Sequence, residues 1–96
     1  MDLFDWDEGN WPKCGKHGVS KAEIEYVFRH RPLVRPDRTP QDEETRYNAV
    51  GINEEGRHIF IVFTLRTKSG YRLVRPISAR YMHRKEVERY EQRKRT

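Results

Sequence analysis

The chain has 96 residues, of which 34% are hydrophobic and 11% are aromatic. This length suffices for a single domain with one modest core, over residues 1–96, and the aromatic content argues against disorder. No stretch approaches the roughly 20 consecutive apolar residues of a membrane-spanning helix, and residues 1–7 lack the basic and apolar regions of a signal peptide. We therefore expect a cytoplasmic protein with no membrane contact.

The net charge of +5 conceals an asymmetry along the chain. Residues 1–65 carry nine Lys and Arg against twelve Asp and Glu, whereas residues 66–96 carry eleven against three. Such a basic C-terminal part is attracted to polyanions or to an acidic partner. Fourteen of the twenty basic residues are Arg, whose planar guanidinium suits bidentate contacts with phosphate. Charge alone does not distinguish RNA from DNA, or either from an acidic protein.

Cys14 is the only cysteine, which excludes an internal disulfide and a cysteine-based zinc site. Basic residues on both sides of Cys14 could lower its pKa, but an unreactive thiol is the favoured interpretation. The sequence also has no carboxylate–histidine cluster at the spacing of metal ligands. We therefore expect neither a metal nor another cofactor.

The clearest local signal is the start of a helix at Ser20. Glu23 follows at the spacing of a capping box, in which each side chain accepts a hydrogen bond from the other residue's backbone N–H. An apolar stripe at helical spacing continues from there, formed by Ile24, Val27 and Phe28. Pro32 disfavours a helical conformation in the residue before it, so this helix is expected to end near His30.

Extended segments are predicted before and after this helix. Short ones are expected at Leu3–Trp6 and Leu33–Arg35, with a polar loop over residues 7–18. A meander of three longer strands is indicated by apolar runs bounded by turn residues: Arg46–Ile52, His58–Arg66 and Tyr71–Ile77. Pro76 cannot donate a ladder hydrogen bond, so the last strand is expected to lie at an edge or to break there.

A second helix is predicted at the C-terminal end, where Ser78 can cap a helix running from about Ala79 toward Arg93. One face of that helix would carry Ala79, His83, Val87 and Tyr90. On this face His83 is expected to be a satisfied histidine at the margin of the core, and residues 91–96 are expected to fray. The predicted class is α+β: an antiparallel sheet of three to four strands with an N-terminal and a C-terminal helix.

Four short blocks stand out by their order and spacing: Phe4-Asp5-Trp6-Asp7, Lys16-His17-Gly18-Val19-Ser20, Arg46-Tyr47 with Gly51, and Arg75-Pro76-Ile77-Ser78-Ala79-Arg80. Together with residues 59–66 and 86–90, they resemble the BrnT family of toxins over nearly the whole chain. The resemblance implies a compact RelE-like fold and a toxin that cleaves RNA without a metal. It also implies a BrnA-type antitoxin that binds DNA, in a heterotetramer of two toxins and two antitoxins.

RNA can be cleaved without a cofactor because its own 2′-hydroxyl can attack the adjacent phosphate. The enzyme then supplies a base, an acid, and cations around the developing negative charge. His17 is the first catalytic candidate, with Lys16 as an RNA contact, because both lie just before a helix N-terminus, where an anion is favoured. The alternative is that His17 only bonds backbone groups in a tight turn.

A second group of candidates consists of charged side chains at the ends of predicted elements. Three arginines could converge on a scissile phosphate, or could instead be solvated or paired on the surface: Arg46, Arg66 and Arg80. Glu86 and Tyr90 lie one helical turn apart and could bring a carboxylate and a phenol to these arginines. The alternatives are an ion pair of Glu86 with Arg89 and core packing of Tyr90. Weaker RNA-binding candidates are Arg75 and Arg84.

Two classes of function are compatible with these residues. The first is a ribonuclease toxin of a type II toxin–antitoxin system, which inhibits translation and growth until a BrnA-like antitoxin neutralises it. The second is a non-catalytic nucleic-acid-binding or regulatory module on the same fold, and a degenerate toxin that only binds its antitoxin is a third possibility. RNA cleavage with growth arrest would support the first, and salt-sensitive binding without cleavage would support the second.

Overall fold

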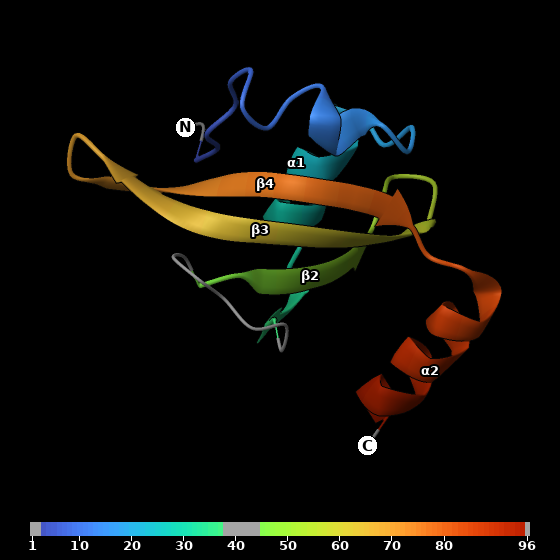
Figure 1. Ribbon diagram of the computed structural model, residues 1–96. Helices are drawn as coiled ribbons and strands as arrows, with labels where there is room; N and C mark the ends of the chain where they lie inside the picture. The colour runs from blue at the N-terminus through green and yellow to red at the C-terminus, as the bar shows by residue number, and fades with distance from the viewer. Residues whose placement is uncertain (1–2, 38–44, 96) are drawn as a thin grey trace.

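The structure is a computed structural model that describes residues 3–37 and 45–95 (Figure 1). Within these residues an antiparallel four-stranded sheet has the order β1-β2-β3-β4. The elements in chain order are η1 (Lys13–Gly15), α1 (Lys21–Arg29), β1 (Leu33–Pro36), β2 (Tyr47–Ile52), β3 (His58–Lys68), β4 (Tyr71–Tyr81) and α2 (Arg84–Arg95). The fold is therefore α+β, with an N-terminal and a C-terminal helix, as the sequence predicted.

Helix α1 begins where the sequence predicted, because its first turn is closed by side chains. The backbone N–H of Glu23 donates to Ser20 Oγ at 3.1 Å, and the N–H of Ser20 donates to Glu23 Oε1 at 3.0 Å. Both hydrogen bonds of the capping box are present. The helix ends at Arg29, one residue before the expected His30 and three before Pro32.

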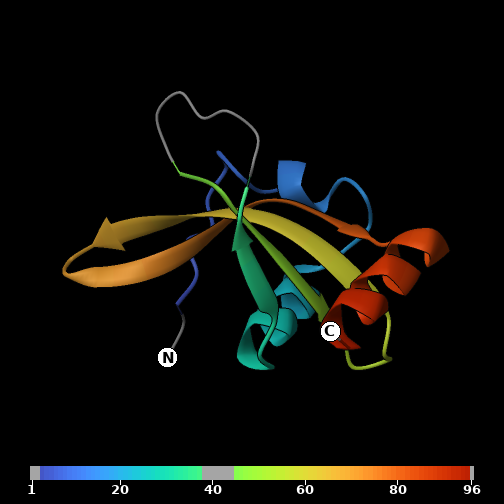
Figure 2. The same cartoon turned by 90° about the horizontal axis from the view of Figure 1, so that it is seen from below.

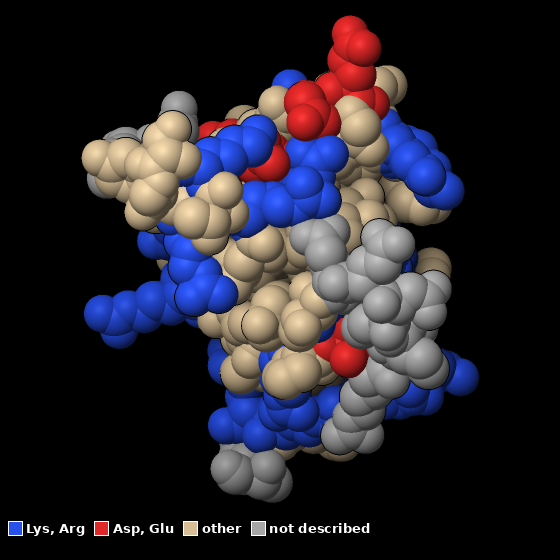
Figure 3. Space-filling view, turned by 60° about the vertical axis from the view of Figure 1, so that its left-hand side comes forward, with Lys and Arg blue, Asp and Glu red and all other residues tan. Residues whose placement is uncertain are grey.

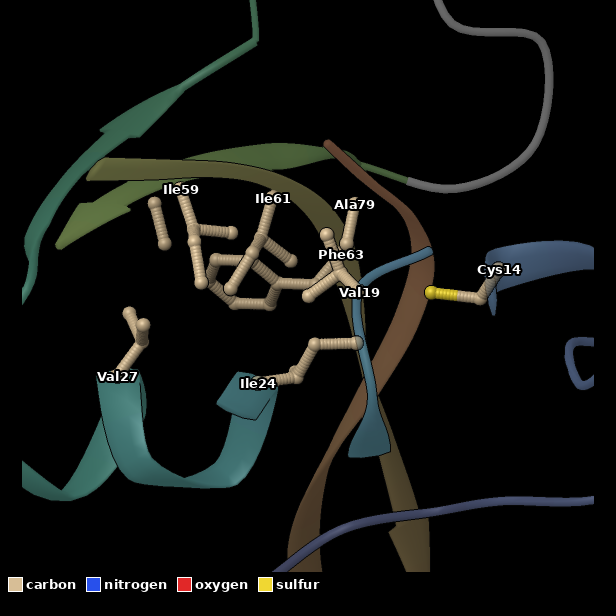
Figure 4. Close-up of a cluster of buried hydrophobic side chains, with 9 residues drawn as sticks. Cys14, Val19, Ile24, Val27, Ile59, Ile61, Phe63 and Ala79 are labelled. Atoms are coloured by element: carbon tan, nitrogen blue, oxygen red, sulfur yellow. The ribbon is translucent and has the colours of Figure 1, made fainter. Parts of the chain in front are cut away.

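The core lies between α1 and one face of the sheet (Figure 4). The apolar stripe of α1 points toward three alternate residues of β3, so the buried contacts are made by Ile24 and Val27 with Ile59, Ile61 and Phe63. Gly51 of β2 permits the close approach of the helix, because a Cβ atom there would lie 2.7 Å from Val27 Cγ1. Burial of this apolar stripe is what holds α1 against the sheet.

The end of β4 corrects the prediction for the C-terminal helix. We expected a helix from Ala79, but β4 continues to Tyr81 and α2 begins only at Arg84. Ala79 pairs with Ile61 of β3 and is 1% exposed, so its contacts are those of a core strand residue. Pairing with β3 satisfies the backbone hydrogen-bonding groups of this segment and buries Ala79.

Pro76 lies within β4, and Glu86 closes the first turn of α2. Pro76 lies opposite a register shift between Val62 and Phe63, in a strand at the edge of the sheet, where a missing N–H donor is tolerated as expected. The first turn of α2 is closed by Glu86 and not by Ser78, because Glu86 Oε1 accepts a hydrogen bond from the N–H of His83 at 2.9 Å. His83 is exposed, outside the core margin where we expected it.

The segment before α1 is more ordered than the predicted polar loop. Phe4 forms a parallel bridge with Val74 beside β4, in place of a full edge strand. Asn10 is buried, and its Nδ2 donates at 2.9 Å to the carbonyl oxygens of Asp5 and Pro76. Cys14 of η1 is fully buried, and burial raises the pKa of its thiol to about 11. The thiol is therefore protonated at neutral pH, in agreement with the favoured interpretation.

Strands β3 and β4 form a long hairpin that extends beyond β2. Its tip and helix α2 lie at opposite ends of the sheet in both ribbon views (Figures 1 and 2). The two turn residues, Ser69 and Gly70, have φ values of 51° and 80°, as a tight two-residue hairpin turn requires. Among the described helices, none is long and apolar enough to cross a membrane.

Candidate active site

The face of the sheet opposite α1 is here called the cavity face, and it carries Arg80 of the candidate residues. Partners in antiparallel strands place their side chains on the same face, so the register defines rows across it. One row consists of Leu33, Val50, Phe60 and Arg80, and the next consists of Arg35, Asn48, Val62 and Ser78. Arg80 therefore belongs to β4 and not to the start of the last helix, where we had placed it.

A groove of about 720 Å³ lies between this face and the C-terminal segment. Apolar and aromatic groups form part of its wall, and polar groups of both charges reach into it from β1, β2 and α2. Its lining residues are Leu33, Arg35, Pro36, Asp37, Asn48, Val50, Phe60, Met82, Glu86, Arg89, Tyr90 and Arg93. A concave site with a few convergent polar groups is the usual form of a ligand-binding site.

Arg80 and Glu86 form a bidentate ion pair beside the groove. Arg80 Nη1 and Nη2 donate to Glu86 Oε1 and Oε2 at 2.7 and 2.8 Å, and the guanidinium lies 4.8 Å from the ring centroid of Phe60. The Arg80 guanidinium lowers the pKa of Glu86 to about 2, with help from the N–H of His83. Glu86 pairs with Arg80 and not, as the alternative interpretation supposed, with Arg89.

His58 does not line the groove but contacts Tyr90, which does, and the sequence reasoning missed it. Its Nε2 lies 3.2 Å from Glu91 Oε1, and its ring is edge-to-face with Tyr90 at a centroid distance of 5.6 Å. Alternation along β3 could have placed His58 on the same strand face as Phe60. Contact with Glu91, 33 residues later, depends on how α2 docks and has no local signal in the sequence.

Arg46 and Arg66 share the cavity face with Arg80 but lie farther along the strands. Tyr47 pairs with Phe63, so extending the register by one residue places Arg46 four residues beyond the row of Phe60 and Arg80, which is about 13 Å. Arg66 is six residues beyond Phe60 on the same strand, about 20 Å. The backbone positions of the three arginines are therefore spread along the cavity face, with Arg80 at one end and Arg66 at the other.

A family model described as "Ribonuclease toxin, BrnT, of type II toxin-antitoxin system" matches residues 6–86. The chain belongs to the BrnT family. The matched range includes the whole sheet, α1, and the ion pair of Arg80 with Glu86. A search of curated proteins found no match. Membership makes this protein a ribonuclease toxin of a type II system, with RNA as its target and an antitoxin as its partner.

Other sequence candidates lie outside the groove of this BrnT protein. Lys16 and His17 are exposed on the segment between η1 and α1, and neither these residues nor those two helices line the groove. Arg84 is 93% exposed and pairs with Glu88, four residues later on α2, at 3.3 Å, also outside the groove. The structure therefore places Glu86 and Tyr90 at the groove beside Arg80, and His17 away from it.

Arg75 is engaged with the N-terminal segment of the BrnT chain. Its Nη1 donates to Asp5 Oδ2 at 3.1 Å and its Nη2 donates to Asp7 Oδ1 at 3.0 Å, while Lys68 Nζ lies 2.7 Å from Asp5 Oδ1. The Arg75 guanidinium lowers the pKa of Asp7 to about 2. The ion pairs of Arg75 with Asp5 and Asp7 thus hold the N-terminal segment against β4, and no local sequence pattern indicated them.

Charge is unevenly spread over the side of the BrnT protein that carries the hairpin tip. Figure 3 shows Lys and Arg over much of this side, whereas Asp and Glu gather mainly near its upper edge. Exposed basic residues of the hairpin are Arg66, Lys68 and Arg72. Within the described ranges there is no group of three or more His, Cys, Asp or Glu residues able to hold a metal ion.

Proposed function

We propose that this BrnT family member cleaves RNA without a metal, at a site formed by the groove and the adjoining cavity face. The 2′-oxygen of the substrate forms a bond to phosphorus while the bond to the 5′-oxygen breaks. A base takes the proton of the 2′-hydroxyl, and an acid gives a proton to the 5′-oxygen. The products carry a 2′,3′-cyclic phosphate and a 5′-hydroxyl. The observation that supports this location best is the guanidinium of Arg80, held in place beside the groove.

In this proposal Arg80 stabilises the negative charge of the pentacoordinate phosphorus. A phosphate that takes over hydrogen bonds of Arg80 releases Glu86, and the pKa of Glu86 then rises because the cause of its depression is removed. A carboxylate freed beside the scissile bond can accept the 2′-proton. Tyr90 lines the same groove and can give a proton to the 5′-oxygen. The ring of His58 packs against Tyr90, and Glu91 in turn contacts His58.

The more distant basic residues act on binding in this proposal. Arg46 and Arg66 follow the cavity face away from Arg80, so they contact successive phosphates of a single strand. Each such contact makes the affinity more dependent on salt. His17 and Lys16 are a separate candidate site before α1, and His17 is the alternative base if the scissile phosphate binds there.

Cleavage of a labelled single-stranded RNA in excess EDTA tests this function. The wild type is expected to cut, leaving 2′,3′-cyclic phosphate ends, and Arg80→Ala is expected to lose at least about 100-fold in rate. A matched His17→Ala variant is expected to keep most of its activity. If only His17→Ala is inactive, the site lies before α1, and if Mg²⁺ is required, the metal-independent reaction is wrong. If free RNA is not cut, the assay is repeated with translating ribosomes.

A non-catalytic nucleic-acid-binding module is the second candidate function. One observation favours it, because Arg80 and Glu86 pair with each other at 2.7 and 2.8 Å, so Glu86 has to lose this partner before it can act as a base. Such a module would shift labelled RNA or DNA in a salt-dependent manner, without cleavage on or off the ribosome. Induced expression would then not arrest growth.

We propose that the partner is a BrnA-type, DNA-binding antitoxin in the cytoplasm, in a heterotetramer of two toxins and two antitoxins. The arginines on the cavity face, Arg46, Arg66 and Arg80, suit an acidic or amphipathic antitoxin segment. Co-expression should relieve growth arrest, and light scattering of the purified complex should give the mass of two copies of each chain. A complex with one copy of each, or an antitoxin that leaves Arg80 accessible to RNA, would contradict this arrangement.

A further inference from the structure

A buried amide oxygen lacks a hydrogen-bond partner inside the groove. Asn48 lies on β2 in the row between Arg35 and Val62, and its side chain is part of the groove lining. Its Oδ1 is buried and accepts no hydrogen bond from the residues that the structure describes. Buried polar atoms are nearly always satisfied in folded proteins, so this oxygen has the capacity to accept a hydrogen bond from a water or a ligand that enters the groove.

The surroundings of Asn48 suit a flat aromatic ligand that carries phosphate. Phe60, Val50 and Tyr90 line the groove with aromatic and aliphatic surface, on which a planar ring can stack. Arg35 and Arg89 reach into the same groove as cations. The groove, at about 720 Å³, is within the usual size range of ligand sites and has room for a purine nucleotide.

We propose that the groove is a nucleobase subsite in which Asn48 binds adenine. Because Oδ1 is buried, binding requires a rotation of the Asn48 side chain toward the groove. The exocyclic amino group of adenine then donates to Oδ1, and N7 accepts from Nδ2, the bidentate pairing that asparagine makes with this base. Stacking on the aromatic side chains holds the ring, and the arginines bind the flanking phosphates. This inference rests on the proposed function and deepens it, because it assigns a preference for adenine next to the bond that is cut.

Binding of adenosine monophosphate, followed by nuclear magnetic resonance, tests the subsite without requiring cleavage. The wild type is expected to bind it at least about tenfold more tightly than uridine monophosphate, with a shift of the Asn48 side-chain amide signals. The variant Asn48→Leu is expected to lose this preference, and ribose 5-phosphate measures the contribution of the phosphate alone. Equal affinity for the three ligands would overturn the proposal, as would a preference for another base.

Thr64→Val is the matched control. Thr64 Oγ1 is also buried without a partner among the described residues, but Thr64 does not line the groove. Its replacement is expected to leave nucleotide binding unchanged. Asn48→Asp keeps the shape of the side chain, so if Asn48→Leu fails to fold, Asn48→Asp still removes the donor and must weaken adenine binding. Thermal unfolding shows which variants are folded.

A cleavage arm separates this inference from the proposed function. In RNAs that differ at one position, wild type is expected to cut preferentially next to adenine, and Asn48→Leu is expected to cut all of them at similar rates. If neither wild type nor any variant cuts RNA, but wild type still binds adenosine monophosphate, the proposed function alone is contradicted. Cleavage with no change of base preference in Asn48→Leu would contradict the subsite alone.

Discussion

Replacement of Glu86 by Gln tests the ion pair at the centre of the site. The amide keeps the shape of the side chain but cannot carry the charge that Arg80 stabilises at 2.7 and 2.8 Å. The pKa of Glu86 falls from 4.5 to about 2, which corresponds to about 3 kcal/mol at 1.36 kcal/mol per pKa unit. Because Arg80 is 38% exposed, solvent screening reduces this to about 1–2 kcal/mol.

The dependence on pH distinguishes the ion pair from simple packing. The pKa of Glu86 is lower in the folded state, so its contribution is fully present above pH 4.5 and is lost as the pH falls toward about 2. Urea denaturation of wild type and Glu86→Gln should therefore differ by about 1–2 kcal/mol at pH 7. The two proteins should converge near pH 2, since the other acidic groups are common to both. A difference that stays constant over this range would refute the reasoning.

Three further predictions concern stability and reactivity. Arg75→Ala should lower the free energy of unfolding by about 1–2 kcal/mol, because it removes the guanidinium from the buried Asp5, which keeps only its contact with Lys68 among the described side chains, whereas the exposed Arg84→Ala should cost under about 0.5 kcal/mol in the same urea titration. Gly51→Ala should destabilise by about 1–3 kcal/mol in thermal melts, because its Cβ meets Val27. Cys14 should resist iodoacetamide at pH 8 until the protein unfolds; fast alkylation of the native protein would contradict its burial.

Features that depend on neighbouring residues were predictable from the sequence. The capping box of Ser20 and Glu23 lies within four residues, and so its hydrogen bonds were foreseen together with the start of α1. The three long strands were also foreseen because apolar runs and turn residues mark them. The end of β4 was not, since Ala79 is a good residue for a helix and only its pairing with Ile61 makes it part of a strand.

The site was predictable only in its residue types. An excess of arginine indicated a phosphate-binding surface. Alternation could place Arg66 on one strand face, but it could not give the distance between Arg66 and Arg80. Contacts between residues far apart in sequence, such as His58 with Glu91 and Arg75 with Asp5, have no local signal. The groove also depends on a long-range arrangement, because the chain leaves the sheet after Tyr81 and α2 then supplies one of its walls.

The most direct test of whether the active site lies at the groove is RNA cleavage by two variants, Arg80→Ala and Arg84→Ala. The single-turnover rate is measured at saturating protein in EDTA. Both variants remove one arginine from the same part of the chain, but only Arg80 is held by Glu86 beside the groove. The proposed site predicts a loss of at least about 100-fold for Arg80→Ala and a rate within about twofold of wild type for Arg84→Ala. Equal rates for the two variants would contradict it.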